Sequence, residues 1–179
     1  MLFRSTASTY AADVLLEILN DESSGFQQRL VERGPFQSLG ASYLTLSEVG
    51  PIQVHGRTTP ERVDEALMAL MTELDASALL MDITREDVAI AQKRREVGRA
   101  LALEATAGLA PGLAHWWASG GMDYYLSYHD SLNTRTLDDL RRFAERYVAS
   151  QPRIIGILGS PGVVARLAES LGASVKSGQ

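Results

Sequence analysis

The strongest pattern along the chain lies between residues 39 and 74, where alternating positions give way to a helical stripe. Residues 39–46 are rich in β-forming side chains and predict a strand, and Gly50-Pro51 predicts a turn. In the next stretch, 51–57, Ile52 and Val54 alternate with polar residues, which is typical of a strand with one packed face. Behind it, apolar residues recur at helical spacing, namely Val63, Ala66, Leu67, Leu70, Met71 and Leu74. We therefore expect a β-hairpin whose apolar face is covered by the following helix.

Two details of this helix follow from its start and from its polar face. Thr59 is expected to be the N-cap, because Pro60 beside it fits a first turn in which a missing N–H is harmless. Glu73 falls opposite the apolar stripe, so its side chain is expected to face solvent.

Helical stripes also flank this unit on both sides. A helix over 8–20 is expected upstream, and a shorter helical piece over 26–31 follows it. Downstream, Thr84–Asp87 and Thr136–Asp139 have the capping-box form with which helices begin. A last helix is expected after Ser160-Pro161-Gly162. The apolar positions are Ala11, Val14, Leu15, Ile18 and Leu19, as a one-sided stripe, in the first helix, and Leu140, Phe143, Ala144, Tyr147 and Val148 in the helix after Thr136.

The run 153–158 is almost continuously apolar and has the length of a buried strand. We expect it to pair with the hairpin as a third strand. With the helices, this predicts an α+β fold, a two-layer α/β sandwich in which helices pack on one face of a mostly antiparallel sheet. The length of 179 residues fits a single domain over 1–179.

Composition and charge narrow the function more than the fold. The net charge of −5 argues against general nucleic-acid binding, which needs a basic surface. The chain has no cysteine, which excludes disulfides, a thiolate nucleophile and a cysteine-based metal site. No stretch of the sequence approaches the roughly 18 apolar residues of a membrane-spanning helix. The compartment stays open between the bacterial periplasm and the cytoplasm.

Several residues of the central unit, taken in order, resemble the pitrilysin/insulinase family of zinc metallopeptidases, the inverted zincins. They are Tyr43, Gly50-Pro51-Ile52, His55-Gly56 and Thr59–Val63 followed by a long amphipathic helix, and the likeness continues over 11–31, 83–109 and 124–152. The similarity is to the C-terminal half of these enzymes, which carries no zinc. In that family, strands precede the helix that corresponds to 8–20. The resemblance therefore implies a fragment, or one half of a larger assembly.

Zinc catalysis in this family needs the motif H-x-x-E-H. The three histidines, His55, His115 and His129, each lack a second histidine within five residues. Active family members also use an Arg-x6-Tyr pair from the C-terminal half to steady the substrate carbonyl. The corresponding positions in this chain are Val31 and Ser38. We therefore expect no catalytic residue and no metal ligand here, and no peptidase activity from the chain alone.

Two aromatic pairs are the best candidates for a contact surface. Trp116 and Trp117 are adjacent, and because helical neighbours point about 100° apart, both cannot face one core. Aromatic residues are enriched at interfaces, which also favours Tyr124 and Tyr125. Plain packing between helices is the alternative. The charged cluster Lys93–Glu96 is expected to be a solvated face.

The resemblance implies a non-catalytic half that helps to enclose a peptide substrate beside a zinc-bearing half, in the same polypeptide or in a partner subunit. Zinc is expected in that partner half, and no cofactor in this chain. The alternative is a structural or assembly subunit, similar to the core proteins of the respiratory cytochrome complex, with no proteolytic role. A shortened sheet leaves an unpaired edge, so we expect the chain to associate with its missing half or with another copy. Neither nucleic acid nor a membrane is expected as a partner.

Overall fold

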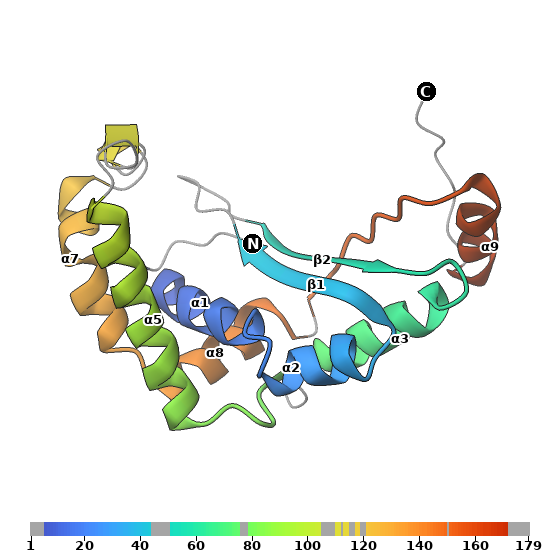
Figure 1. The fold of residues 1–179 in the computed structure, drawn as a ribbon, viewed down its shortest axis with the longest axis horizontal. Helices are drawn as coiled ribbons and strands as arrows, with labels where there is room; N and C mark the ends of the chain where they lie inside the picture. The colour runs from blue at the N-terminus through green and yellow to red at the C-terminus, as the bar shows by residue number, and fades with distance from the viewer. Residues whose placement is uncertain are drawn as a thin grey trace.

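The computed structural model describes residues 6–43, 51–75, 79–104, 110–111, 113–114, 117–118, 121–149 and 151–171. The elements in chain order are α1 (Thr6–Leu19), α2 (Gly25–Gln27), the π-helical turn η1 (Gln28–Glu32), β1 (Phe36–Tyr43), β2 (Ile52–Thr58), α3 (Val63–Glu73), α5 (Arg85–Glu104), α7 (Met122–Asn133), α8 (Leu137–Tyr147) and α9 (Pro161–Leu171). Figure 1 shows α1, α2, α3 and α8 on one side of the two strands, and none of the described helices covers their other side. This arrangement confirms the predicted α+β class with helices on one face of the sheet.

The two strands form the antiparallel hairpin that the alternating pattern predicted. Ala41 lies opposite Val54 and Gly40 lies opposite His55, with one irregularity between Phe36 and Ser38. A Cβ atom at Gly40 would lie 3.0 Å from Nε2 of His55, so glycine gives the imidazole room to lie across the neighbouring strand. The first strand begins at Phe36, earlier than predicted. Residues 44–46 of the predicted strand lie outside the described residues.

Helix α1 is the centre of the core, and it is buried on nearly all sides rather than along the predicted single stripe. Tyr10, Ala12 and Leu16 are buried together with the predicted positions. The reason is tertiary: α5, α7, α8 and β1 all pack against α1. A helix that is surrounded in this way needs apolar residues on most of its faces, as α1 has, and Asp13 is a buried charge among them.

Helix α3 covers the hairpin as expected, but two of its predicted details are wrong. Its N-cap is Arg62 and not Thr59, because residues 60–62 form a separate turn before the helix starts. Glu73 does not face solvent alone: its carboxylate accepts hydrogen bonds from Nε and Nη2 of Arg29 at 2.7 and 2.9 Å. The helical spacing predicted that Glu73 faces solvent, but an ion pair with Arg29 of η1 holds its side chain.

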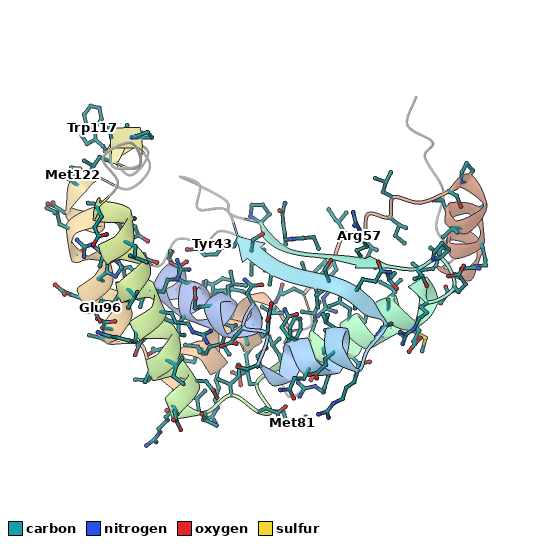
Figure 2. The ribbon with its side chains drawn as sticks, in the orientation of Figure 1. Tyr43, Arg57, Met81, Glu96, Trp117 and Met122 are labelled. Atoms are coloured by element: carbon teal, nitrogen blue, oxygen red, sulfur yellow. The ribbon has the colours of Figure 1, made fainter. Side chains whose placement is uncertain are left out.

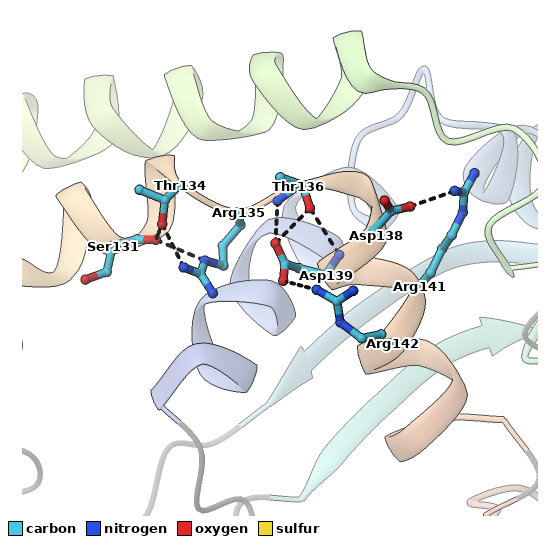
Figure 3. A network of polar contacts seen from close by, with 8 residues as sticks. All are labelled: Ser131, Thr134, Arg135, Thr136, Asp138, Asp139, Arg141 and Arg142. Carbon is cyan, nitrogen blue, oxygen red and sulfur yellow. Dashed lines mark hydrogen bonds and ion pairs between the residues drawn. The ribbon is translucent and has the colours of Figure 1, made fainter.

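Both capping boxes form as predicted, at the starts of α5 and α8. At the second, the Thr136 hydroxyl accepts from the Asp139 backbone N–H at 3.3 Å, and Asp139 Oδ2 accepts from the Thr136 N–H at 2.8 Å. Figure 3 shows this box between α7 and α8, with Arg142 donating to the other Asp139 oxygen. The cap fixes where α8 begins and so aims its stripe of Leu140, Phe143 and Ala144 into the core.

The predicted third strand at 153–158 is wrong. The sheet of the described residues has two strands only, and residues 151–160 have no regular structure. Ile154 and Leu158 are fully exposed. Arg153 holds the run instead, by donating to the backbone oxygens of Leu74 and Val148. The apolar run therefore starts at the ends of α3 and α8 and does not pair with β1 or β2.

Candidate functional site

A cluster of three tyrosines joins α7 to the centre of the molecule. Tyr124 and Tyr128 are four residues apart on α7, so their rings lie on one face of that helix. Tyr124 stacks on Tyr10 of α1 with ring centroids 5.7 Å apart, and Tyr128 meets the Tyr10 ring edge-on at 5.5 Å. These contacts fix the position of α7 against α1 and leave the other side of α7 open.

The tyrosine cluster borders a buried charge, Asp13 of α1, which is 8% exposed. Oδ1 of Asp13 accepts a hydrogen bond from Nη2 of Arg95 at 2.8 Å, and Oδ2 accepts one from the Tyr43 hydroxyl at 3.3 Å. The Tyr128 hydroxyl also donates to Oδ2. Arg95 in turn lies 3.3 Å from the Glu17 carboxylate. One carboxylate therefore ties together α1, β1, α5 and α7.

Burial dominates the protonation of these groups. Desolvation raises the pKa of Asp13, although the Arg95 charge and the hydrogen bonds from Tyr128 and Tyr43 act in the opposite direction. The pKa of Tyr128 is also raised, mainly by burial and then by the neighbouring Asp13 charge. The phenol of Tyr128 is therefore a hydrogen-bond donor at neutral pH, and it is too weak an acid to serve as a proton source.

A groove of about 460 Å³ runs beside this network, between α5 and α7. Within the described part of the chain, Arg99 has no carboxylate in ion-pair contact, and Nδ1 of His129 is buried without a hydrogen-bond partner. Desolvation lowers the pKa of His129, and the Arg99 and Arg95 charges lower it further. The lining residues are Glu17, Arg94, Arg95, Gly98, Arg99, Ala102, Tyr124, Tyr125, Tyr128 and His129.

The structure separates the aromatic residues that the sequence grouped as a candidate interface. Trp117 is 73% exposed, and Figure 2 places it near Met122 at the end of the α5–α7 pair, away from the strands. Tyr125 lines the groove and is half-buried, whereas Tyr124 belongs to the internal tyrosine cluster. Trp116 lies outside the described residues.

The charged cluster Lys93–Glu96 divides between solvent and core. Lys93 and Glu96 pair with each other on an exposed face, as predicted. Arg94 and Arg95 instead reach α1 and its C-terminal end, where they pair with Asp21 and Asp13. The solvated-face interpretation is therefore wrong for Arg95, whereas Arg94 is exposed and pairs with Asp21 at the surface. The signal in the sequence was Asp13, a charged residue among apolar ones. A buried carboxylate needs a cation, and Arg95 is that cation.

The comparison with protein families identifies this architecture. The profile of the peptidase M16 inactive domain matches residues 3–95, which is just over half of the chain. The chain belongs to this family. The match confirms the resemblance to the pitrilysin/insulinase metallopeptidases and to their half without zinc.

Three solved structures of proteases or of a peptidase domain share the fold. The inactive peptidase domain of a presumed zinc protease from Bordetella parapertussis is 18% identical, with a TM-score of 0.71 over 87% of each chain. A protease from Helicobacter pylori (19% identity, TM-score 0.65) and a presumed M16-like peptidase from Alicyclobacillus acidocaldarius (19%, 0.60) match 81% and 78% of this chain. The matched part covers only about a third of each of these two proteins, 35% and 33%. A comparison with curated proteins gave no match.

The structure of this M16 inactive domain also places the positions that correspond to the family's Arg-x6-Tyr pair. Val31 lies in η1, partly buried against the core, and Ser38 is exposed on β1 opposite Arg57. Arg29, near this position in sequence, is engaged by Glu73 and Asp82. Val31 and Ser38, at the corner between η1 and β1, therefore provide neither the guanidinium nor the phenol that would bind a substrate carbonyl.

Metal-ligating side chains do not converge in the part of the chain that the structure describes. His55 lies on β2 against Gly40, whereas His129 lies on α7 in the groove, and no group of three or more His, Asp or Glu residues could hold an ion there. These residues do not fit the zinc site of the family. Among the described helices, none is long and apolar enough to cross a membrane.

Proposed function

We propose that this M16 inactive domain is the non-catalytic half of an insulinase-like zinc metallopeptidase. In this proposal it encloses a peptide beside a zinc-bearing half, which is a separate segment or subunit. The observation that carries the proposal is the match of residues 3–95 to the inactive-domain profile. The sequence supports it, because the H-x-x-E-H motif and the Arg-x6-Tyr pair are both missing.

The shape of the domain supports enclosure. Helices cover one side of the hairpin, and no helix of the part that the structure describes covers the other (Figure 1). Gln53, His55 and Arg57 are exposed along β2, at alternate positions that share one face of the strand. A polar, hydrated face of this kind suits the wall of a chamber that holds an extended peptide without binding one sequence tightly.

The end of the α5–α7 pair is the part of the surface that we propose for contact with the zinc-bearing half. Trp117, Leu101 and Leu126 are all well exposed there, at 73%, 60% and 61%. Exposed apolar side chains that gather at one end of a domain mark interaction sites, and tryptophan is enriched among the residues that dominate binding energy. Tyr125, which lines the adjoining groove, extends this surface.

Reconstitution tests the proposal. The chain is mixed with the H-x-x-E-H half encoded in the same or the adjacent reading frame, and cleavage of an unstructured fluorogenic peptide is followed. We expect activity from the mixture and none from this chain alone. Trp117→Ala should weaken the association of the halves roughly tenfold, which corresponds to about 1.4 kcal/mol. Ile90→Ala, an exposed apolar residue elsewhere on α5, is the matched control and should have no effect.

Two results would contradict the proposal. One is full activity of the zinc-bearing half without this chain. The other is a complex of the two halves that stays inactive on every peptide, which favours the alternative of an assembly subunit.

A further inference from the structure

The three arginines that line the groove between α5 and α7 differ in whether they have a partner. Arg94 pairs with Asp21, and Arg95 pairs with two carboxylates of α1. Arg99 is half-buried, and no carboxylate of the described residues lies within ion-pair distance of it. A guanidinium that is partly removed from water and unpaired attracts an anion more strongly than a fully solvated one does.

The segment that joins α5 to α7 does not supply the missing partner. Residues 105–121 contain no aspartate and no glutamate. Glu96, one turn before Arg99 on α5, pairs with Lys93 on an exposed face. Arg99 is therefore the cation of this groove that is available to a ligand.

His129, on the α7 side of the groove, responds to the same charge. Burial lowers the pKa of its imidazole, and the charges of Arg99 and Arg95 lower it further, against the opposing charges of Glu96 and Asp130. Its Nδ1 is buried and has no hydrogen-bond partner among the described residues. An anion beside Arg99 would offset the positive charge and allow this imidazole to take up a proton.

The groove has room for a ligand beside these groups. Gly98 lines it, and a Cβ atom at this position would meet no other atom of the described structure within 4 Å. The half-buried ring of Tyr125 and the methyl group of Ala102 provide apolar wall. The volume of about 460 Å³ lies within the range of roughly 300–1,000 Å³ that is usual for small-ligand sites.

We propose that the groove between α5 and α7 binds a carboxylate of a peptide, which pairs with the guanidinium of Arg99. A single unpaired cation matches the one negative charge of a carboxylate better than the nearly double charge of a phosphate group. A planar carboxylate also accepts two parallel hydrogen bonds from a guanidinium. The choice of a peptide as the carrier rests on the proposed function, in which this domain encloses one. The carboxylate belongs either to the chain end or to an acidic side chain.

Binding of three acetylated peptides to this chain alone tests the proposal by calorimetry at low salt. The first ends in alanyl-phenylalanine with a free carboxylate, and we expect it to bind. The second is the same peptide as an amide, which should bind at least roughly tenfold more weakly because it has no charge for Arg99. The third is an amide with aspartate in place of the alanine. Binding of the third like the first assigns the carboxylate to a side chain, and binding like the second assigns it to the chain end.

Two pairs of variants locate the site. Arg99→Gln should reduce binding of the carboxylate peptide at least roughly tenfold and leave the amide unaffected. Arg85→Gln, at an exposed arginine of the same helix outside the groove, is the matched control. Gly98→Leu fills the groove without changing a charge and should abolish binding, whereas Gly98→Ala should retain most of it. Both replacements favour the helix, so neither is expected to impair folding.

The pKa of His129 gives a second readout, by NMR titration of the imidazole. The carboxylate peptide should raise this pKa, because its charge offsets those of Arg99 and Arg95, and the amide should not. In Arg99→Gln the pKa should already be higher without peptide, and it should not rise further when peptide is added. Glu96 and Asp130 are unchanged in all these samples.

Three outcomes would overturn the proposal. They are no binding of any peptide, equal affinity for the carboxylate and amide peptides, and an Arg99→Gln variant that binds like Arg85→Gln. If no peptide binds and Arg99→Gln weakens association with the zinc-bearing half, the carboxylate comes from that half and the peptide is excluded. Activity of the reconstituted halves without peptide binding in this groove leaves the proposed function standing.

Discussion

The centre of the molecule around α1 and the side that carries β2 and residues 151–160 are both apolar in sequence, but they differ in what covers them. Leu15 and Leu140 in the centre are almost completely buried, whereas Ile154 and Leu158 are fully exposed. The centre is surrounded because four elements converge on one helix. The other side has a hairpin, a run without regular structure and α9. An apolar sequence thus indicates that its side chains need to be buried. Whether the chain itself buries them depends on how many of its elements pack around them.

Polar groups show the same contrast. In the centre, the buried carboxylate of Asp13 has Arg95 and two phenols as partners. In the groove between α5 and α7, the guanidinium of Arg99 has no carboxylate partner among the described residues. A charged group without a partner is tolerated where water reaches it and becomes unfavourable once it is covered. The groove is therefore suited to a ligand that brings a carboxylate as well as apolar area.

The largest expected effect comes from breaking the charge network of the centre. Arg95→Ala leaves Asp13 buried without its cation and should lower the free energy of unfolding by about 3–5 kcal/mol at neutral pH. The loss should narrow as the pH falls, because a protonated Asp13 no longer needs the arginine. Urea unfolding at two pH values measures both effects. Arg141→Ala, which removes an exposed pair with Asp138, should stay within about 0.5 kcal/mol. Equal losses from both variants would mean that the network is solvated.

A matched pair of leucines compares the two regions directly. Leu140→Ala creates a cavity in the centre and should destabilise the chain by about 2–5 kcal/mol. Leu158→Ala removes a side chain that is already fully exposed and should change stability by less than about 0.5 kcal/mol. Both are measured by chemical denaturation at concentrations below self-association. A large loss from Leu158→Ala in the monomer would show that the run 154–158 is packed in solution.

The helices and the hairpin were predictable because their signals are local. The helical stripe behind Val63 and the alternation around Ile52 and Val54 depend only on spacing along the chain. The capping boxes at Thr84 and Thr136 were equally readable, since the two partners are three residues apart. Each of these patterns lies within a short stretch of sequence, so it predicts the element without knowledge of any tertiary contact.

What the sequence did not reveal depends on contacts between distant residues. Asp13 and Arg95 are 82 positions apart, so no spacing rule connects them. Arg29 and Glu73 form an ion pair across 44 positions. The helical spacing alone predicted that Glu73 faces solvent, and it could not show this pair. For the run 153–158, composition and length were correct for a strand, but Arg153 bonds to the backbone of Leu74 and Val148, and the run does not join the sheet.

The smallest expected effect concerns the margin of the centre, where the groove between α5 and α7 reaches His129. Burial and the charges of Arg99 and Arg95 lower the pKa of His129, against the weaker opposing charges of Glu96 and Asp130. Between the lowered pKa and the ordinary value near 6.5, the unfolded chain binds a proton that the folded chain does not. Stability should therefore fall as the pH drops from neutrality through this window.

His129→Gln should flatten the slope of stability against pH in this window, because glutamine cannot take up the proton. Ser127→Ala, at an exposed position of the same helix, removes no titratable group; it is the control and should leave the slope unchanged. Thermal unfolding across the acidic range measures the slopes of the three proteins. An unchanged slope in His129→Gln would show that water fills the groove far enough to solvate the imidazolium. Tyr128 would then belong to the buried centre of the molecule, and His129 would lie outside it.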